Sequence, residues 1–302
     1  MCIRDSIITD LKEAFRRGNV YIQLIFINVG VFVITTLIGI LLQLFNRSAA
    51  GIFELLALPA SFTRFAWQPW SIFTYMFMHA GFLHILFNML WLYWFGALFL
   101  YFFSGKHLRG LYIVGGICGG LLYMISYNVF PYFRPMTAYS TMVGASASVL
   151  AIVVATAYRE PNYPVRLLFF GNVRLKYLAL IVVLTDLLFI TSSNAGGHIA
   201  HLGGALAGLW FAASLNKGKD ITSWVNKALD AIAALFSAKT WKRKPKMKVH
   251  YGNNTRQNDY DYNARKKAQS DEIDRILDKL KKSGYESLTT EEKKSLFDAS
   301  KR

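Results

Sequence analysis

A serine and a histidine in separate apolar segments are the residues of this sequence best placed to do chemistry. Ser146 follows Gly144 by two residues, and His201 lies in the last strongly apolar segment. Polar side chains are costly at membrane depth and are usually functional there. A serine hydroxyl is a weak nucleophile at neutral pH unless a base such as an imidazole lies beside it. The pair therefore predicts a hydrolase that works within a membrane, provided that the two segments pack together.

Candidate oxyanion donors lie in an earlier apolar segment. His84 and Asn88 are four residues apart, so both side chains share one face of a helix. Two donors on one face suit the negative oxygen that forms during acyl transfer. Ser146 is expected to begin a helix just after Gly144, and its free N–H would add a third donor. We therefore expect His84, Asn88 and the turn at Gly144 to stabilise the oxyanion.

Other interpretations of the same residue types stay open. A serine in an apolar helix is often bonded only to the backbone of the previous turn. His198 and His201 are three residues apart and are also spaced as two metal ligands on one helix. Asp186 is the only carboxylate within the expected spans, and we interpret it as a structural or interfacial residue rather than as a catalytic partner of His201.

The composition indicates a membrane protein. Of the 302 residues, 54% are hydrophobic and 17% are charged, whereas soluble domains are about 25% charged. Stretches that reach or approach the length of a transmembrane helix occupy residues 20–44, 82–103, 110–130, 142–158, 176–193 and 198–215. Strand-like alternation is absent, so we expect an all-α bundle of six membrane-spanning helices.

Small residues predict which of these helices pack closely. They recur on the expected fourth and sixth helices, at Gly144, Ala145, Ala147, Ala151, Ala200, Gly204 and Gly208. Small residues at such spacing let two membrane helices approach each other. Contact between these two helices would bring the Ser146 hydroxyl to the His201 imidazole.

The distribution of Lys and Arg predicts the orientation in the membrane. These residues are frequent in the N-terminal segment, in the second and fourth loops and in the tail, whereas the opposite side carries only Arg47, Arg64 and Arg134. We therefore expect both termini in the cytoplasm. The long first loop, residues 45–81, is apolar and rich in Trp, which predicts a loop half-buried in the membrane interface.

Charge divides the chain into a core and a tail. Residues 1–215 carry 13 Lys/Arg and 6 Asp/Glu, whereas residues 216–302 carry 21 and 12. An N-terminal segment of residues 1–19, of which the first six carry no structural signal, precedes the core of residues 20–215. Residues 216–249 are expected to form an amphipathic helix and a basic run that attracts anionic lipid.

The rest of the tail is expected to contain a polar linker and a helical hairpin. The linker covers residues 250–267 and the hairpin residues 268–302. Gly284 is expected to end the first helix, and Thr289 with Glu292 to form a capping box for the second. We interpret the hairpin as a docking or regulatory element for a cytoplasmic partner. No nucleic-acid partner is expected, because the basic run adjoins membrane spans.

Together these motifs resemble the rhomboid family of intramembrane serine proteases. The resemblance covers residues 20–215, and the runs that carry it are Pro69–Trp70, Met78–Asn88, Trp91–Gly96, Gly144–Ala147 and Ala200–Gly208. It departs from the pattern of many relatives at three positions, which are Ser71, Ala147 and Leu150.

The resemblance assigns roles to the candidate residues. It implies that Ser146 is the nucleophile and His201 the general base of a Ser–His dyad, with His84 and Asn88 at the oxyanion. The glycine spacing after His201 favours this histidine over His198 as the base. Secondary candidates at the site are His79, His198 and Trp70.

The resemblance also implies an activity and a location. Such a protein cleaves transmembrane protein substrates near the outer membrane face through an acyl-enzyme, and it needs no cofactor or metal. We expect a multi-pass protein of the bacterial plasma membrane. Two alternatives from other classes are a proteolytically inactive rhomboid-like protein that binds membrane clients, and a membrane protein that holds a metal or haem through its histidines.

Overall fold

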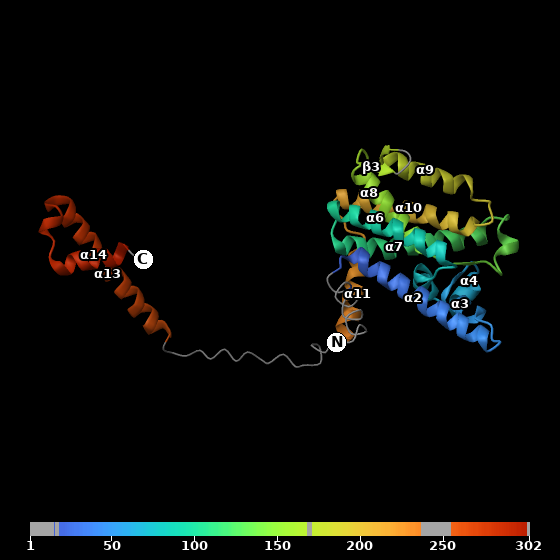
Figure 1. The fold of residues 1–302 in the computed structure, drawn as a ribbon, viewed down its shortest axis with the longest axis horizontal. Coiled ribbons are helices and arrows are strands. Elements are labelled where there is room, and N and C mark those ends of the chain that lie inside the picture. The colour runs from blue at the N-terminus through green and yellow to red at the C-terminus, as the bar shows by residue number, and fades with distance from the viewer. Residues whose placement is uncertain (1–14, 16–17, 168–170, 237–254, 301–302) are drawn as a thin grey trace, which may run out of the picture. The chain divides into compact units, whose positions relative to one another are not determined.

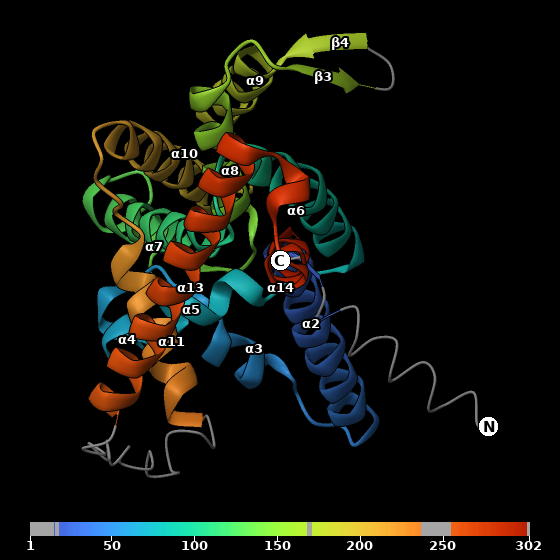
Figure 2. The ribbon, with the colours of Figure 1, turned by 90° about the vertical axis from the view of Figure 1, so that its left-hand side faces the viewer.

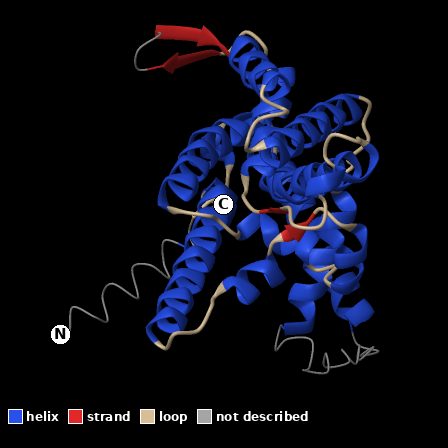
Figure 3. Cartoon of the chain, turned by 90° about the vertical axis from the view of Figure 1, so that its right-hand side faces the viewer, coloured by secondary structure: helices blue, strands red, loops and turns tan. Residues whose placement is uncertain are grey.

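The computed structural model describes residue 15 and residues 18–167, 171–236 and 255–300 of the chain. The chain divides into two compact units, Met1–Thr240 and Trp241–Arg302 (Figure 1). Helices dominate both units, and the strands of the described residues form two small antiparallel pairs (Figure 3). The fold is therefore the all-α membrane fold that the sequence predicts.

Four long helices of the first unit can cross a membrane. They are α2 (Val20–Leu44), α6 (Phe82–Phe102), α7 (Gly105–Val129) and α10 (Ala195–Asn216). Two 14-residue helices, α8 (Ser146–Arg159) and α9 (Leu175–Leu188), lie at the positions of the other two expected spans. Of the described helices, only the four long ones meet both the length and the hydropathy needed for a span.

Two helices differ in extent from the apolar stretches that predict them. Helix α8 begins at Ser146, as predicted, and not where its apolar stretch begins at residue 142, because Thr141–Met142 form strand β2 and pair with β1 (Leu58–Pro59). Helix α7 begins at Gly105 rather than at residue 110, and the Ser104 hydroxyl caps it by accepting a hydrogen bond from the backbone N–H of His107. A capping side chain can extend a helix beyond its apolar stretch.

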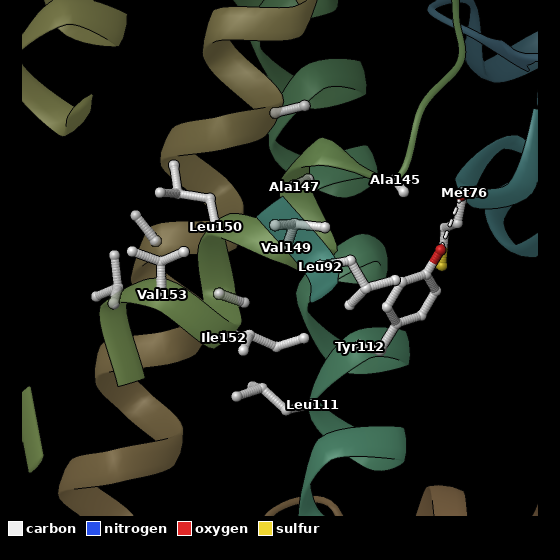
Figure 4. Packing of buried hydrophobic residues seen from close by; sticks show 14 of the residues in the cluster. Met76, Leu92, Leu111, Tyr112, Ala145, Ala147, Val149, Leu150, Ile152 and Val153 are labelled. Carbon is white, nitrogen blue, oxygen red and sulfur yellow. Dashed lines mark hydrogen bonds between the residues drawn. The ribbon is translucent and has the colours of Figure 1, made fainter. Parts of the chain in front are cut away.

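Helix α8 is the centre of the bundle. All but three of its residues are buried, and its neighbours are α6, α7, α9 and α10. Figure 4 shows Val149 and Ile152 of α8 near Leu92 of α6 and Leu111 of α7. A helix that is apolar all round needs such complete enclosure.

Glycines let α8 and α10 meet backbone to backbone. A Cβ atom on Gly204 would fall on the Ala147 carbonyl, and one on Gly208 would fall on the Ala151 carbonyl. On the next helix, a Cβ on Gly119 of α7 would lie 2.6 Å from the Ala147 Cβ. The expected close packing of the fourth and sixth helices is thus confirmed.

The first loop consists of short helical turns over a buried strand. It contains α3 (Ala50–Leu56), α4 (Phe62–Trp67), α5 (Ser71–Thr74) and the 3₁₀ turn η1 (Tyr75–Phe77). Its middle, residues 57–60, is buried, whereas large apolar side chains around it are exposed, among them Phe62, Trp67, Trp70 and Phe73. The loop after α7 includes the 3₁₀ turn η2 (Arg134–Met136).

Two elements flank the bundle. Strands β3 (Pro164–Leu167) and β4 (Gly171–Arg174) form an antiparallel ribbon that leads into α9 and projects from it (Figure 2). Helix α11 (Ser223–Phe236) is the amphipathic helix expected after the bundle. Its Val225 is buried against Val114 and Ala207, while its Trp224 stays half-exposed.

The second unit is a helical hairpin. Helix α13 runs over Thr255–Ser283, η3 over Tyr285–Ser287 and α14 over Thr290–Ser300. Where a polar linker was expected up to residue 267, the chain is already helical from Thr255. This stretch lacks an apolar face, and only its Arg, Gln, Ala and Lys residues have high helix propensity. The basic run at residues 239–248 lies outside the described residues.

The expected boundaries inside this hairpin are confirmed. Gly284 has φ of 74° directly after the last residue of α13. The Thr289 N–H donates to the Glu292 carboxylate (2.8 Å), and the Glu292 N–H donates to the Thr289 hydroxyl (3.3 Å). This reciprocal pair is the capping box.

Candidate active site

Two cavities at one end of the bundle are lined by the predicted catalytic residues. A cavity of about 310 Å³ lies among α6, α8, α9 and α10, and one of about 580 Å³ lies beneath the loops at the same end. Ser146, His201 and Asn88 line both cavities, and His84 lines the larger one. Four predicted site residues from three helices are thus brought together.

The walls of the smaller cavity are mostly apolar. They are formed by Phe87 and Trp91 of α6, Val149 and Leu150 of α8, and Ile181 and Val182 of α9. Such a cavity suits a hydrophobic side chain or a stretch of apolar peptide. Its polar end is formed by Ser146, Asn88, Asp186 and His201.

Helix α8 places Ser146 at its first position. The backbone N–H of Ser146 therefore has no acceptor within the helix, and the positive end of the helix dipole lies beside its hydroxyl. The contact of Ala147 with Gly204 holds α8 against α10 one residue after Ser146 and three residues after His201. The segments that carry the serine and the histidine are thus fixed to each other.

Gly144 supplies space rather than a hydrogen bond. Its φ of 132° is one that residues with a Cβ rarely adopt. A Cβ there would lie 2.9 Å from His84 Nε2 and 3.6 Å from Ser146 Oγ. Its N–H donates to the Tyr75 carbonyl (2.9 Å). Gly144 is therefore not a free oxyanion donor, contrary to expectation, and instead lets His84 approach Ser146.

Hydrogen bonds orient His84 and Asn88. The Nδ1 of His84 accepts from the Ala80 N–H (3.4 Å), so in the neutral ring the proton is on Nε2, the atom nearest Gly144. The Asn88 amide donates to the His84 carbonyl (2.8 Å), and its second N–H is left for a ligand. Both side chains can therefore donate into the cavity beside Ser146.

A carboxylate on α9 orients His201. The Nδ1 of His201 lies 2.8 Å from Oδ1 of Asp186, and the Nδ1 of His198 lies 2.8 Å from the same oxygen. Asp186 is 4% exposed. A carboxylate that accepts from Nδ1 leaves Nε2 as the basic nitrogen of the ring. His201 is thus held in the tautomer that a serine nucleophile requires.

Asp186 contacts the site more directly than the sequence predicts. It was interpreted as structural or interfacial, yet it contacts the predicted base directly. A signal was present, because the connection between α9 and α10 is short and Asp186 lies in the last turn before it. Two antiparallel helices joined by a short loop bring their adjoining ends together.

Of the secondary candidates, His79 and His198 contact site residues, whereas Trp70 lines neither cavity. His79 is buried and packs edge-on against His84 with ring centroids 5.1 Å apart. Burial, with His84 beside it, lowers the pKa of His79 to about 4, so its ring is neutral at physiological pH. Trp70 lies in the first loop, where its indole N–H donates to the Leu55 carbonyl (3.0 Å). Its role there is to fix the loop.

Comparisons with known proteins agree with this arrangement. A family model described as the Rhomboid domain matches residues 66–217, just over half of the chain. A second, described as a family of unknown function (DUF6576), matches residues 257–302. A curated relative, RHOMBOID-like protein 12, mitochondrial, from Arabidopsis thaliana, is 29% identical over 158 residues. The aligned region covers 49% of this chain and 47% of the relative, so the chain spans about half of the relative's length.

The matched domain coincides with the site. Residues 66–217 include the end of the first loop, helices α6 to α10 and every residue that lines the two cavities. The small-residue contacts of α7, α8 and α10 also lie within it. The chain is a membrane protein of the rhomboid family.

Proposed function

We propose that this protein is an intramembrane serine endopeptidase that cleaves transmembrane segments of other proteins. The observation that carries the proposal is that Ser146 and His201 line the same two cavities, together with Asn88. The orientation of His201 by Asp186 and the approach of His84 to Gly144 support it. A protein that only binds clients has no need of an oriented base beside a helix N-terminal serine.

The proposed reaction begins with attack by Ser146. Its Oγ bonds to the carbonyl carbon of the scissile peptide while its proton passes to Nε2 of His201. The resulting oxyanion accepts hydrogen bonds from the Ser146 N–H, His84 Nε2–H and Asn88 Nδ2–H. Asp186 stabilises the imidazolium through Nδ1.

Breakdown of the tetrahedral intermediate completes the cycle. The C–N bond breaks as His201 returns the proton to the leaving amine, which gives an ester between the substrate acyl group and Ser146. A water molecule, deprotonated by His201, then attacks the ester and releases the acid and the free serine.

The short helix α8 explains how water reaches a site inside a membrane protein. Fourteen residues span about 21 Å, whereas the hydrocarbon core is about 30 Å thick. If its C-terminal end lies at one membrane surface, Ser146 lies below the other. The larger cavity, lined by the loop residues Ser140–Val143 and Ser193–Asn194, would connect it to water.

The location is part of the proposal. Lys and Arg positions favour cytoplasmic termini. The plan of six spans, of which α8 and α9 are short, and the family resemblance favour a bacterial plasma membrane. The relative named above is mitochondrial by name. Transmembrane proteins are the proposed substrates, anionic lipid the proposed partner of the basic run, and a cytoplasmic protein the proposed partner of residues 268–302.

Covalent labelling tests the nucleophile without knowledge of the substrate. Full-length protein in liposomes is treated with a fluorescent fluorophosphonate, which traps an activated serine. We expect labelling of wild type, none of Ser146→Ala and strongly reduced labelling of His201→Ala. In parallel, cleavage of a model transmembrane substrate should fall at least about 10⁴-fold in both variants.

The alternative function predicts a different labelling result. A proteolytically inactive rhomboid-like protein would bind transmembrane clients but leave the fluorophosphonate unreacted in wild type as well. Equal labelling of wild type and Ser146→Ala would also contradict the proposed nucleophile. Thermal unfolding of each variant serves as the control for folding.

A further inference from the structure

One carboxylate oxygen at the site is shared by two imidazoles. Oδ1 of Asp186 lies 2.8 Å from Nδ1 of His198 and 2.8 Å from Nδ1 of His201. Oδ2 of the same carboxylate is buried and has no hydrogen-bond partner among the described residues. A reaction that needs only an oriented base uses one of these histidines, so His198 and Oδ2 call for a separate explanation.

The three side chains form a compact set of metal ligands. One ligand atom from each of Asp186, His198 and His201 lies within 4.8 Å of the others. The two histidines are one turn apart on α10, and the carboxylate comes from α9. Two imidazoles and one carboxylate are a donor set that zinc and similar transition metals bind, with a fourth position left open.

The geometry needs little adjustment to hold such an ion. Ligands about 2.0–2.1 Å from a tetrahedral zinc are about 3.3 Å apart. The present N···O separations of 2.8 Å must therefore open by about half an ångström. Side-chain rotation is sufficient for this, and Oδ2 offers a second oxygen for the ion.

Metal binding would change the tautomer of His201. An ion at Nδ1 displaces the proton that now points to Asp186, and in the neutral ring that proton moves to Nε2. Nε2 is the atom that must accept the proton of Ser146 in the proposed reaction. A ring protonated at Nε2 cannot do so, so an occupied site is an inactive site.

We propose that Asp186, His198 and His201 bind a divalent transition-metal ion of the zinc class, and that this ion reversibly inhibits the protease. The inhibition rests on the proposed function, whereas the binding does not. His198 distinguishes the two roles, because it contributes a ligand but lines neither cavity.

Cobalt is the probe for binding, because tetrahedral Co²⁺ with such ligands absorbs visible light. Full-length Ser146→Ala protein without a histidine tag, in detergent, is titrated with Co²⁺ and then with competing Zn²⁺. We expect one ion per chain. Introducing His198→Gln into this Ser146→Ala protein should raise the Kd for Co²⁺ at least tenfold. The matched control is His107→Gln, which removes a histidine from the first turn of α7 that lies 3.7 Å from Asp220 and should leave binding unchanged.

Activity is measured separately on protein with an intact Ser146. Micromolar Zn²⁺ should suppress fluorophosphonate labelling and substrate cleavage at least tenfold, and a chelator should restore both. His198→Gln should label and cleave without Zn²⁺ and resist the ion. A chelator alone should not lower the activity of wild type.

Each possible result has one meaning. Co²⁺ binding that is absent, or that is equal in Ser146→Ala with and without His198→Gln, overturns the metal site even if the protein cleaves. Binding that depends on His198 in a protein that neither labels nor cleaves supports the site and overturns the proposed protease. Cleavage that survives Ser146→Ala and is lost with chelator overturns both inhibition and the serine mechanism.

Discussion

Asp186 is the side chain on which the behaviour of His201 depends. Replacing Asp186 with Asn removes the acceptor that holds the Nδ1 proton, so His201 can turn or change tautomer. We expect kcat to fall about 10²- to 10⁴-fold with KM little changed. The measurement is steady-state cleavage in liposomes. Asp220→Asn, at the other His–Asp pair, is the matched control and should cleave normally.

The absence of a Cβ at Gly144 leads to a second prediction about a single residue. An added Cβ would meet His84 Nε2 and strain a backbone with φ of 132°. We expect Gly144→Ala to lower cleavage by at least about 10²-fold, because it displaces an oxyanion donor. Gly171→Ala also places a Cβ at positive φ, but in open space, so it should cost stability without selective loss of activity. Equal activity of both variants would contradict the role of Gly144.

At this scale the sequence predicted four residues that line the cavities, but not their hydrogen bonds. Ser146, His201, His84 and Asn88 were recognised because each is a polar residue in an apolar segment. The Tyr75 carbonyl that accepts from Gly144 was not predicted, since that hydrogen bond joins segments far apart in the sequence, and Asp186 was not predicted as the partner of His201, although only a short connection separates their helices. Spacing along one helix carries no information about a contact with another.

Between elements, the closest approach is that of α8 and α10. Gly204→Ala places a methyl group on the Ala147 carbonyl, so the two helices must separate. We expect a loss of about 1–3 kcal/mol and a Tm lower by roughly 3–10 °C, with cleavage reduced because Ser146 moves from His201. Gly30→Ala, on a helix face with open space, should keep or slightly raise the Tm. Thermal unfolding in detergent provides the comparison.

The capping box of α14 predicts a pH dependence in the second unit. Hydrogen bonds from Lys279 and Thr289 lower the pKa of Glu292 to about 2. Since the unfolded value is near 4.5, the ionised carboxylate favours the hairpin above that pH, and this contribution is lost as the pH falls from about 4.5 to 2. The protection factor of the α14 amides, which is the intrinsic exchange rate divided by the observed one, should therefore fall over this range in wild type. In Glu292→Gln the protection factor should be low already at higher pH and should change little.

Element boundaries show where sequence patterns suffice. The four long helices and the end of α13 at Gly284 were predicted, because hydropathy and a C-terminal glycine are local signals. The start of α8 at Ser146 was also predicted, whereas the pairing of Met142 with Leu58 was not, because it depends on a segment far away in the sequence. The helix at residues 255–267 was missed, because its residues lack the apolar face that marks most helices.

In the whole molecule, every residue of the candidate site belongs to the first unit. We expect a chain that ends after Thr240 to label with fluorophosphonate and to cleave a model substrate within about twofold of the full-length rate, because none of the described residues of the tail, 255–300, lines either cavity. A larger loss would show that residues 241–302 act on catalysis. Preserved cleavage of the model substrate with loss of a native client would assign the tail to recruitment.

The enclosure of α8 has a consequence for biosynthesis. A 14-residue helix is too short for the membrane-insertion machinery to retain on its own, and its small residues find their partners only on α7 and α10. Since α10 is synthesised after α8, the surroundings of Ser146 stay incomplete until residues up to 216 have been synthesised. A truncated or stalled nascent chain would thus lack the assembled candidate site.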